Sequence, residues 1–264
     1  MNRSVLGFGS GAAIGLLGGL IGLGGAEFRL PVLVGWLGMT PRSAVPMNLV
    51  VSLITLSAAL IGRASSLSLV PIQPHVPEIA GLIAGGLVSA IWGAGALSKL
   101  SDRRLSRILA ALLTGIGLLL VVESALPNQS QALIPSGLVT RAVAGVLFGL
   151  LIGAIAALLG VAGGEMLIPT FIFAFGADIA TAGTASILVS MVLVLAALVR
   201  YGQLKLLPGR ANLRAIAIPM GSGSILGAIA GGLMIGLIAP EIFKLGLGII
   251  LIVSAVRTFK KVGH

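Results

Sequence analysis

The chain contains no cysteine and only two histidines among its 264 residues. Without cysteine there is no disulfide scaffold, no thiolate metal site and no thiol nucleophile. His75 stands in a proline-rich loop and His264 is the last residue, and neither has a helical partner at ligand spacing. We interpret both as solvated loop residues, and we expect neither a bound metal nor a cofactor.

Charged residues are scarce as well, at 9%, whereas hydrophobic residues reach 57%. A water-soluble domain needs about a quarter of its residues charged, so the composition indicates a chain embedded in a lipid bilayer. The formal charge of +10 does not indicate nucleic acid, because the basic residues flank apolar segments and do not gather on one face. HExxH, Walker-type and nucleophile-elbow motifs are also missing, so we expect neither an enzyme nor an ATP-driven module.

The sequence does contain one glycine-acid-proline segment twice, as GLIGLGGAEFRLP at Gly19–Pro31 and AALLGVAGGEMLIP at Ala156–Pro169. A gap-free shift of 138 residues superposes Glu27 on Glu165 and keeps its register through the loops. An internal duplication explains this match. The superposed positions include Gly22/Gly160, Gly25/Gly163, Pro31/Pro169, Gly85/Gly223 and Gly93/Gly231.

Long apolar stretches predict the membrane spans, since about 20 helical residues cross roughly 30 Å of hydrocarbon. A shorter segment lies between the first two spans of each half, at Glu27–Met39 and Glu165–Ala177. Such a segment can complete a crossing if the glycine-rich stretch before it is unwound and buried against protein. The predicted long spans are Ser4–Leu23, Ser43–Ile61, Pro77–Leu97 and Leu105–Glu123 in the first half, and Leu138–Leu159, Thr181–Val199, Leu213–Ile238 and Ile242–Phe259 in the second.

Basic residues are distributed oppositely over equivalent loops of the two halves. The loop Ser98–Arg107 has four of them and its counterpart has only Lys244, whereas Arg63 stands alone opposite a loop with Arg200, Lys205, Arg210 and Arg214. Because cytoplasmic loops are enriched in Lys and Arg, this reversal predicts two repeats of inverted topology with an odd number of crossings each. We therefore expect an all-α integral membrane protein with five segments per repeat and short or broken helices at the glycine motifs. Residues 1–124 form one repeat, 125–137 an extracytoplasmic linker and 138–264 the other, and both termini are cytoplasmic.

Glycines before a helix start let backbone N–H groups approach an anion, which the helix dipole also favours. Gly24 and Gly25 in one repeat, and Gly163 and Gly164 in the other, are candidates to form one anion site near the membrane midplane. Close helix packing is the alternative explanation.

Glu27 and Glu165 follow these glycines, and a carboxylate inside a membrane segment usually marks an ion or proton pathway. Stabilisation of a helix start is their alternative role. An ionised carboxylate would occupy the anion site or repel an anion from it, and protonation of the carboxylate would make the site available. Transport would then be linked to protons. Arg29 is near enough to pair with Glu27, but its counterpart is Leu167, so the repeats share no arginine role.

Polar residues occur at matched positions on the helices after the short segments. Asn48 and Ser52 share one helix face, and Ser186 and Ser190 share the corresponding face. With Thr184, they are candidates to donate hydrogen bonds to an oxyanion, although such hydroxyls often bond to their own backbone or a neighbouring helix. We expect Asp178 to cap the helix that follows it.

The pair GLIGLGGAEFRLPVL and LLGVAGGEMLIPTF resembles the TauE/SafE family of membrane permeases, which is associated with export of sulfite and organosulfonates. The family's glycine cluster and following proline are present in both halves, and Ala26 and Ala162 stand where a further glycine is expected. The resemblance covers nearly the whole chain. It implies small sulfur-containing anions as the substrate class.

Together these observations predict a secondary anion transporter that works by alternating access in a bacterial cytoplasmic membrane. A small-anion channel and a non-transporting scaffold or assembly factor are the alternatives. The sequence leaves open which anion is carried, the direction, the coupling ion and stoichiometry, and whether the chain acts alone or as a homo-oligomer.

Overall fold

The computed structural model describes residues 3–21, 25–64, 70–125, 132–233, 245–246 and 248–256, and every regular element in these ranges is helical. This confirms the all-α prediction. The first half contains α1 (Arg3–Ile21), α2 (Ala26–Gly35), α3 (Pro41–Ala64), η1 (Val70–His75), α4 (Val76–Lys99) and α5 (Asp102–Ala125). The second contains α6 (Leu138–Leu159), α7 (Gly164–Pro169), η2 (Thr170–Ala174), α8 (Ile179–Gln203), α9 (Arg210–Asn212), η3 (Leu213–Ala217) and α10 (Ile218–Leu233), and residues 248–256 are helical too.

Five helical stretches in the described part of the chain are long and apolar enough to cross a membrane. Each overlaps a predicted span, which supports an integral membrane protein. The helices α1 and α5 cover two more predicted spans, and the last, Ile242–Phe259, falls partly outside the described residues, so ten crossings stay a prediction. The five stretches are Pro41–Ile61, Ile72–Lys99, Leu138–Leu159, Thr181–Gln203 and Arg210–Gly231.

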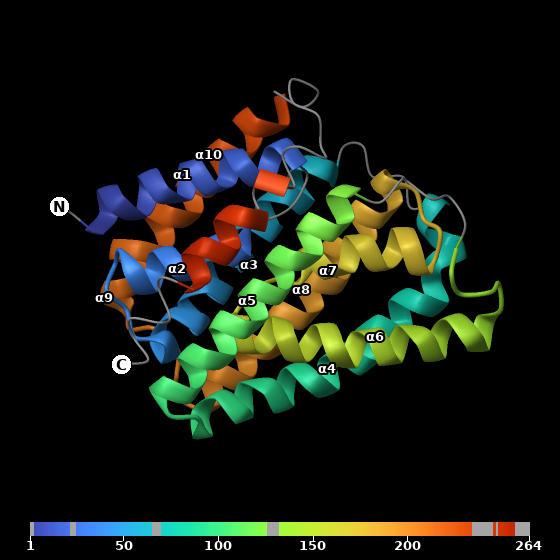
Figure 1. Ribbon diagram of the computed structural model, residues 1–264, viewed down its shortest axis with the longest axis horizontal. Helices are drawn as coiled ribbons and strands as arrows, with labels where there is room; N and C mark the ends of the chain where they lie inside the picture. The colour runs from blue at the N-terminus through green and yellow to red at the C-terminus, as the bar shows by residue number, and fades with distance from the viewer. Residues whose placement is uncertain are drawn as a thin grey trace.

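The two most extensive helix contacts join one half of the chain to the other: α1 packs along α10, and α4 packs along α6 (Figure 1). Glycines let these backbones approach closely. A Cβ on Gly11 of α1 would lie 2.2 Å from the carbonyl oxygen of Met220, and one on Gly149 of α6 would lie 2.4 Å from that of Leu82. These two contacts are related by the same shift of 138 residues, so the duplication extends from the sequence to the packing.

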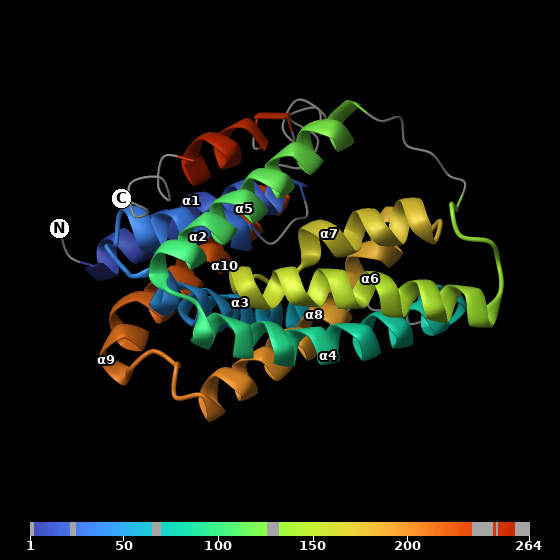
Figure 2. The ribbon, with the colours of Figure 1, turned by 60° about the horizontal axis from the view of Figure 1, so that its bottom comes forward.

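The paired helices run in the same direction, because successive glycines of one helix meet successive turns of the other. Gly145, Gly149 and Gly153 of α6 approach Glu78, Leu82 and Gly86 of α4 in that order. In Figures 1 and 2, α1 and α10 run from left to right, whereas α4 and α6 run from right to left. The first helix of each half therefore runs opposite to its counterpart in the other half.

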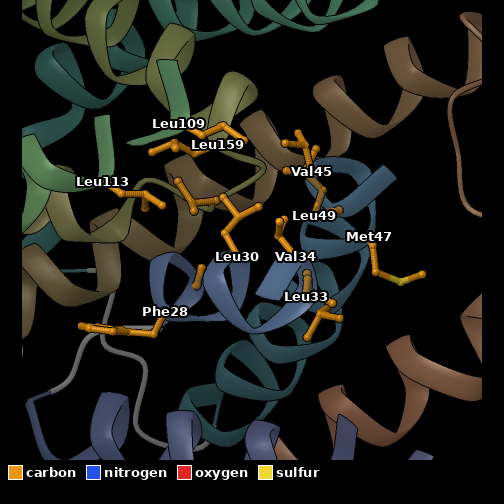
Figure 3. Packing of buried hydrophobic residues seen from close by; sticks show 14 of the residues in the cluster. Phe28, Leu30, Leu33, Val34, Val45, Met47, Leu49, Leu109, Leu113 and Leu159 are labelled. Atoms are coloured by element: carbon orange, nitrogen blue, oxygen red, sulfur yellow. The ribbon is translucent and has the colours of Figure 1, made fainter. Parts of the chain in front are cut away.

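The short helix α2 is enclosed by the hydrophobic core. Leu30 and Leu33 pack in one cluster with Val45 from α3 and Leu159 from α6 (Figure 3). Most residues of α2 are buried, including both of its charged side chains. The helix has ten residues and is about 15 Å long, half the thickness of the hydrocarbon core. It therefore holds its charged residues at depth within the protein.

The second short helix is similar in length: Gly164–Ala174 is continuous through α7 and the π-helical η2. The backbone before it, at Gly160–Gly163, is non-helical and buried, as expected for irregular backbone shielded from lipid. The following helix, α8, has Asp178 at its start, where Thr181 N donates to Oδ1 over 3.0 Å. This confirms the predicted cap.

The interpretation of His75 as a solvated residue is wrong. Its Nδ1 lies 2.7 Å from Oε1 of Glu78, which is fully buried and also accepts a bond from Nη1 of Arg141 at 3.1 Å. Arg141 reaches on to the carbonyl oxygen of Phe175 at 3.3 Å. This network ties the starts of α4 and α6 to the end of η2, and it arises because a buried carboxylate needs charged or hydrogen-bonding partners. His264 lies outside the described residues.

Candidate functional site

Each short helix begins at a glycine in the left-handed conformation. Gly25, with φ of 63°, precedes α2, and Gly163, with φ of 82°, precedes α7. A side chain is strained in this region, and a Cβ on Gly25 would also lie 2.9 Å from Cγ2 of Ile14. The turns place Glu27 and Glu165 in the first turn of their helices. Gly24 lies outside the described residues.

The two glutamates, 138 positions apart in sequence, come together in the interior. Glu27 is 0% exposed and Glu165 is 1% exposed. Their carboxyl groups lie near enough to repel each other electrostatically, and the guanidinium of Arg29 attracts both. No donor in the described part of the chain reaches either oxygen of Glu27 or Oε2 of Glu165, and the two carboxyl groups lie close enough to share a hydrogen bond when one of them is protonated. Two acids and one base therefore form a buried charge cluster whose formal charge is −1 when all three are ionised.

Arg29 is the third member of this cluster and is 1% exposed. Its Nη2 donates a long hydrogen bond of 3.5 Å to Oγ of Ser52, whereas Nε and Nη1 have no partner. Arg29 is not among the site residues predicted from the sequence, because its counterpart Leu167 cannot share its role. An arginine within a membrane segment is as costly as a glutamate, and that signal alone could have identified it.

Polar side chains of α3 and α8 lie beside the starts of the short helices. Nδ2 of Asn48 donates to the carbonyl oxygen of Ala26 at 2.9 Å. At the matching place in the second half, a Cβ on Gly164 would lie 3.6 Å from Oγ of Ser186. These two contacts again follow the 138-residue shift. Asn48 and Ser186 thus each face the motif of their own half.

Ser52 and Ser190 differ in their partners. Oγ of Ser52 accepts the bond from Arg29, but Oγ of Ser190, which is 1% exposed, has no partner. The difference follows from the sequence, since position 167 has a leucine where position 29 has an arginine. Thr184 is half-buried on α8, two residues before Ser186 and hence away from the face that Ser186 and Ser190 share. Its role stays a prediction.

Several buried polar atoms of the charge cluster and of the neighbouring helices α3 and α8 have no hydrogen-bond partner. The donors are two nitrogens of Arg29 and the hydroxyl of Ser190, and the acceptors are oxygens of Glu27, Glu165 and Asn48. Most buried polar groups in proteins are hydrogen-bonded, so such a group of open donors and acceptors can take a small polar guest. Within the described residues no three side chains of His, Cys, Asp or Glu are grouped to hold a metal ion.

A family model described as sulfite exporter TauE/SafE matches residues 7–258. The match covers both copies of the glycine-acid segment and all of the residues placed in the charge cluster. No curated protein and no solved structure matches the chain.

Proposed function

The chain belongs to the sulfite exporter TauE/SafE family, and from this premise we propose that it is a secondary transporter of small sulfur-containing anions such as sulfite or organosulfonates. The family is one of transporters, and the long apolar helices fit a membrane transporter. The observation that carries the finer proposal is the buried cluster of Glu27, Arg29 and Glu165, which combines a cation with two acids away from solvent. Backbone amides at Gly25, Gly163 and Gly164 complete the anion site in this proposal, with Gly24 as a further candidate.

Proton linkage follows from the charges in the cluster. With both acids ionised, the site has a formal charge of −1 and repels a second negative charge. An anion that enters adds at least one more, and a proton on Glu27 or Glu165 offsets that charge. We therefore propose that, in one step of the transport cycle, the protein binds the anion together with a proton.

Alternating access is supported by the arrangement of the two halves. The first helix of each half packs along a helix of the other half, and each of these helices runs opposite to its repeat counterpart, α1 to α6 and α4 to α10 (Figure 1). Inverted repeats that rock against each other about a central site are the common design of secondary transporters. The proposed repeats are residues 1–124 and 138–264, joined by 125–137.

Basic residues support the proposed orientation. The α4–α5 turn and the α8–α9 loop lie at the same end of the bundle in Figures 1 and 2, and Lys and Arg residues lie in or directly beside both connections. At that end Arg42 donates to the carbonyl oxygen of Leu100. Because positive loops stay in the cytoplasm, we propose that this end is cytoplasmic, as are both termini.

Sulfite uptake into proteoliposomes with an imposed pH gradient tests this function. We expect wild-type protein to accumulate sulfite above equilibrium, and Glu165→Gln to lose the dependence of flux on pH. Asp102→Asn is the matched control, because Asp102 is an exposed acid at the start of α5. Flux that only follows the sulfite gradient would instead indicate a channel. Absence of flux, with loss of partner association in Gly25→Ala, would indicate a scaffold.

A further inference from the structure

Arg29 has more hydrogen-bonding capacity than its surroundings use. A guanidinium has five N–H donors in a planar fork, and Nε and Nη1 of Arg29 have no partner although the side chain is 1% exposed. Its hydrogen bond to Ser52 is long at 3.5 Å. A buried arginine in this state is suited to an oxyanion, which accepts two parallel bonds from the fork.

We propose that the guanidinium of Arg29 is the cation that binds the transported anion, and that the site takes a single anion because only one repeat supplies such a cation. The proposal rests on the anion transport proposed above. It adds the residue that supplies the binding charge. It also explains why a site built from two matched halves is asymmetric.

The asymmetry is visible in the partners of the matched serines. Ser52 contacts Arg29, whereas the hydroxyl of Ser190 has no partner, and Leu167 stands at the position that matches Arg29. In this proposal the hydroxyl of Ser190 is the second repeat's donor to the anion. In this arrangement the first repeat contributes the charge and the second contributes a neutral hydrogen bond.

The two glutamates compete with the anion for the same cation. Arg29 attracts both carboxylates, so an anion has to replace part of that attraction. The other titratable groups on α1 and α3, which pack against α2, lie at helix ends: Arg3 on α1, and Arg42 and Arg63 on α3. Protonation of Glu27 or Glu165 therefore releases Arg29 for the anion, which joins this proposal to the proposed proton linkage.

The test compares KM for sulfite uptake in proteoliposomes among variants of Arg29. Arg29→Leu introduces at position 29 the residue type found at the matched position, Leu167. We expect KM to rise about 10- to 100-fold, as for loss of a charged hydrogen-bonding group. Arg29→Lys keeps the charge without the fork, so we expect a smaller rise of about 3- to 10-fold. Arg103→Leu removes an exposed arginine of α5 as the control and should leave KM unchanged.

Because Arg29→Leu leaves two buried acids without a counter-charge, Glu27→Gln/Arg29→Leu is measured beside it. The double variant keeps the formal charge of −1 but has no guanidinium, and we expect its KM to stay raised. A second readout is the melting temperature, which sulfite should raise in wild type and not in either Arg29→Leu protein. If wild type transports sulfite and the folded single or double variant does so with KM within about twofold, the proposal is wrong. If wild type does not transport sulfite or methanesulfonate, the proposed function itself fails.

Discussion

The close contact between α4 and α6 gives the sharpest prediction of stability. A Cβ on Gly85 of α4 would lie 2.1 Å from the carbonyl oxygen of Val146, whereas ordinary contacts of this kind begin at 3.4 Å. Gly85→Ala therefore requires the two backbones to separate by about 1.3 Å. Because the Cβ position is fixed by the backbone of α4 and the oxygen belongs to the backbone of α6, no side chain can turn aside to relieve the clash.

Overpacking of this kind costs about 1–3 kcal/mol, and each kcal/mol lowers the melting temperature of a chain of this size by roughly 2–4 °C. We expect Gly85→Ala to melt roughly 2–12 °C below wild type in detergent. The melting temperature is measured as the loss of protein recovered by size-exclusion chromatography after heating. Gly223→Ala should lose a similar amount, because a Cβ on Gly223 would lie 2.2 Å from the carbonyl oxygen of Phe8.

The matched control lies on the same helix. A Cβ on Gly95 of α4 meets nothing within 4 Å, and alanine favours helix over glycine by up to about 1 kcal/mol. Gly95→Ala should therefore melt at or above the wild-type temperature. If Gly85→Ala is as stable as wild type, or if Gly95→Ala is equally destabilised, the described packing of α4 on α6 is incorrect.

Three further substitutions test other parts of the structure by melting temperature and sulfite flux. Glu78→Gln removes the buried counter-charge of Arg141 and should cost on the order of 2–3 kcal/mol; unchanged stability would contradict the network. Ser190→Ala removes a hydroxyl without a partner, so stability should hold or rise by about 1 kcal/mol while KM for sulfite rises about 3- to 10-fold; a large loss of stability would show that the hydroxyl is bonded. Gly25→Ala places a side chain in the left-handed region at a cost of about 1–2 kcal/mol before its clash with Ile14; wild-type stability would show that the turn has another conformation.

The long helices, and the positions that the internal duplication matches, could be predicted from the sequence. Hydropathy predicts the long helices because lipid-facing residues must be apolar along a whole span. The shift of 138 residues has no gap. It relates Glu27 to Glu165, and it also relates the contact of Gly11 to that of Gly149. Which helices pair across the two halves could not be predicted, because a repeat defines matched positions and not the contacts between them.

The residues missed from the sequence have partners far along the chain or no counterpart in the repeat. Glu78 and Arg141 are 63 positions apart, and only the parallel packing of α4 and α6 brings them together. Features common to both halves do not predict Arg29, because its counterpart is Leu167. Its burial beside Glu27 depends on the core that encloses α2.

The central claim is that the two glycine-acid segments meet in one site, and a double-mutant cycle on Glu27→Gln and Glu165→Gln tests it most directly. Side chains in contact show coupling of about 0.5–3 kcal/mol, whereas distant ones add within about 0.3–0.5 kcal/mol. We predict that the effects of the two substitutions on unfolding free energy and on KM for sulfite are coupled by more than about 0.5 kcal/mol, because the two carboxyl groups repel each other and share Arg29. Effects that add within about 0.3 kcal/mol in both measurements would place the two glutamates in separate sites and contradict the account.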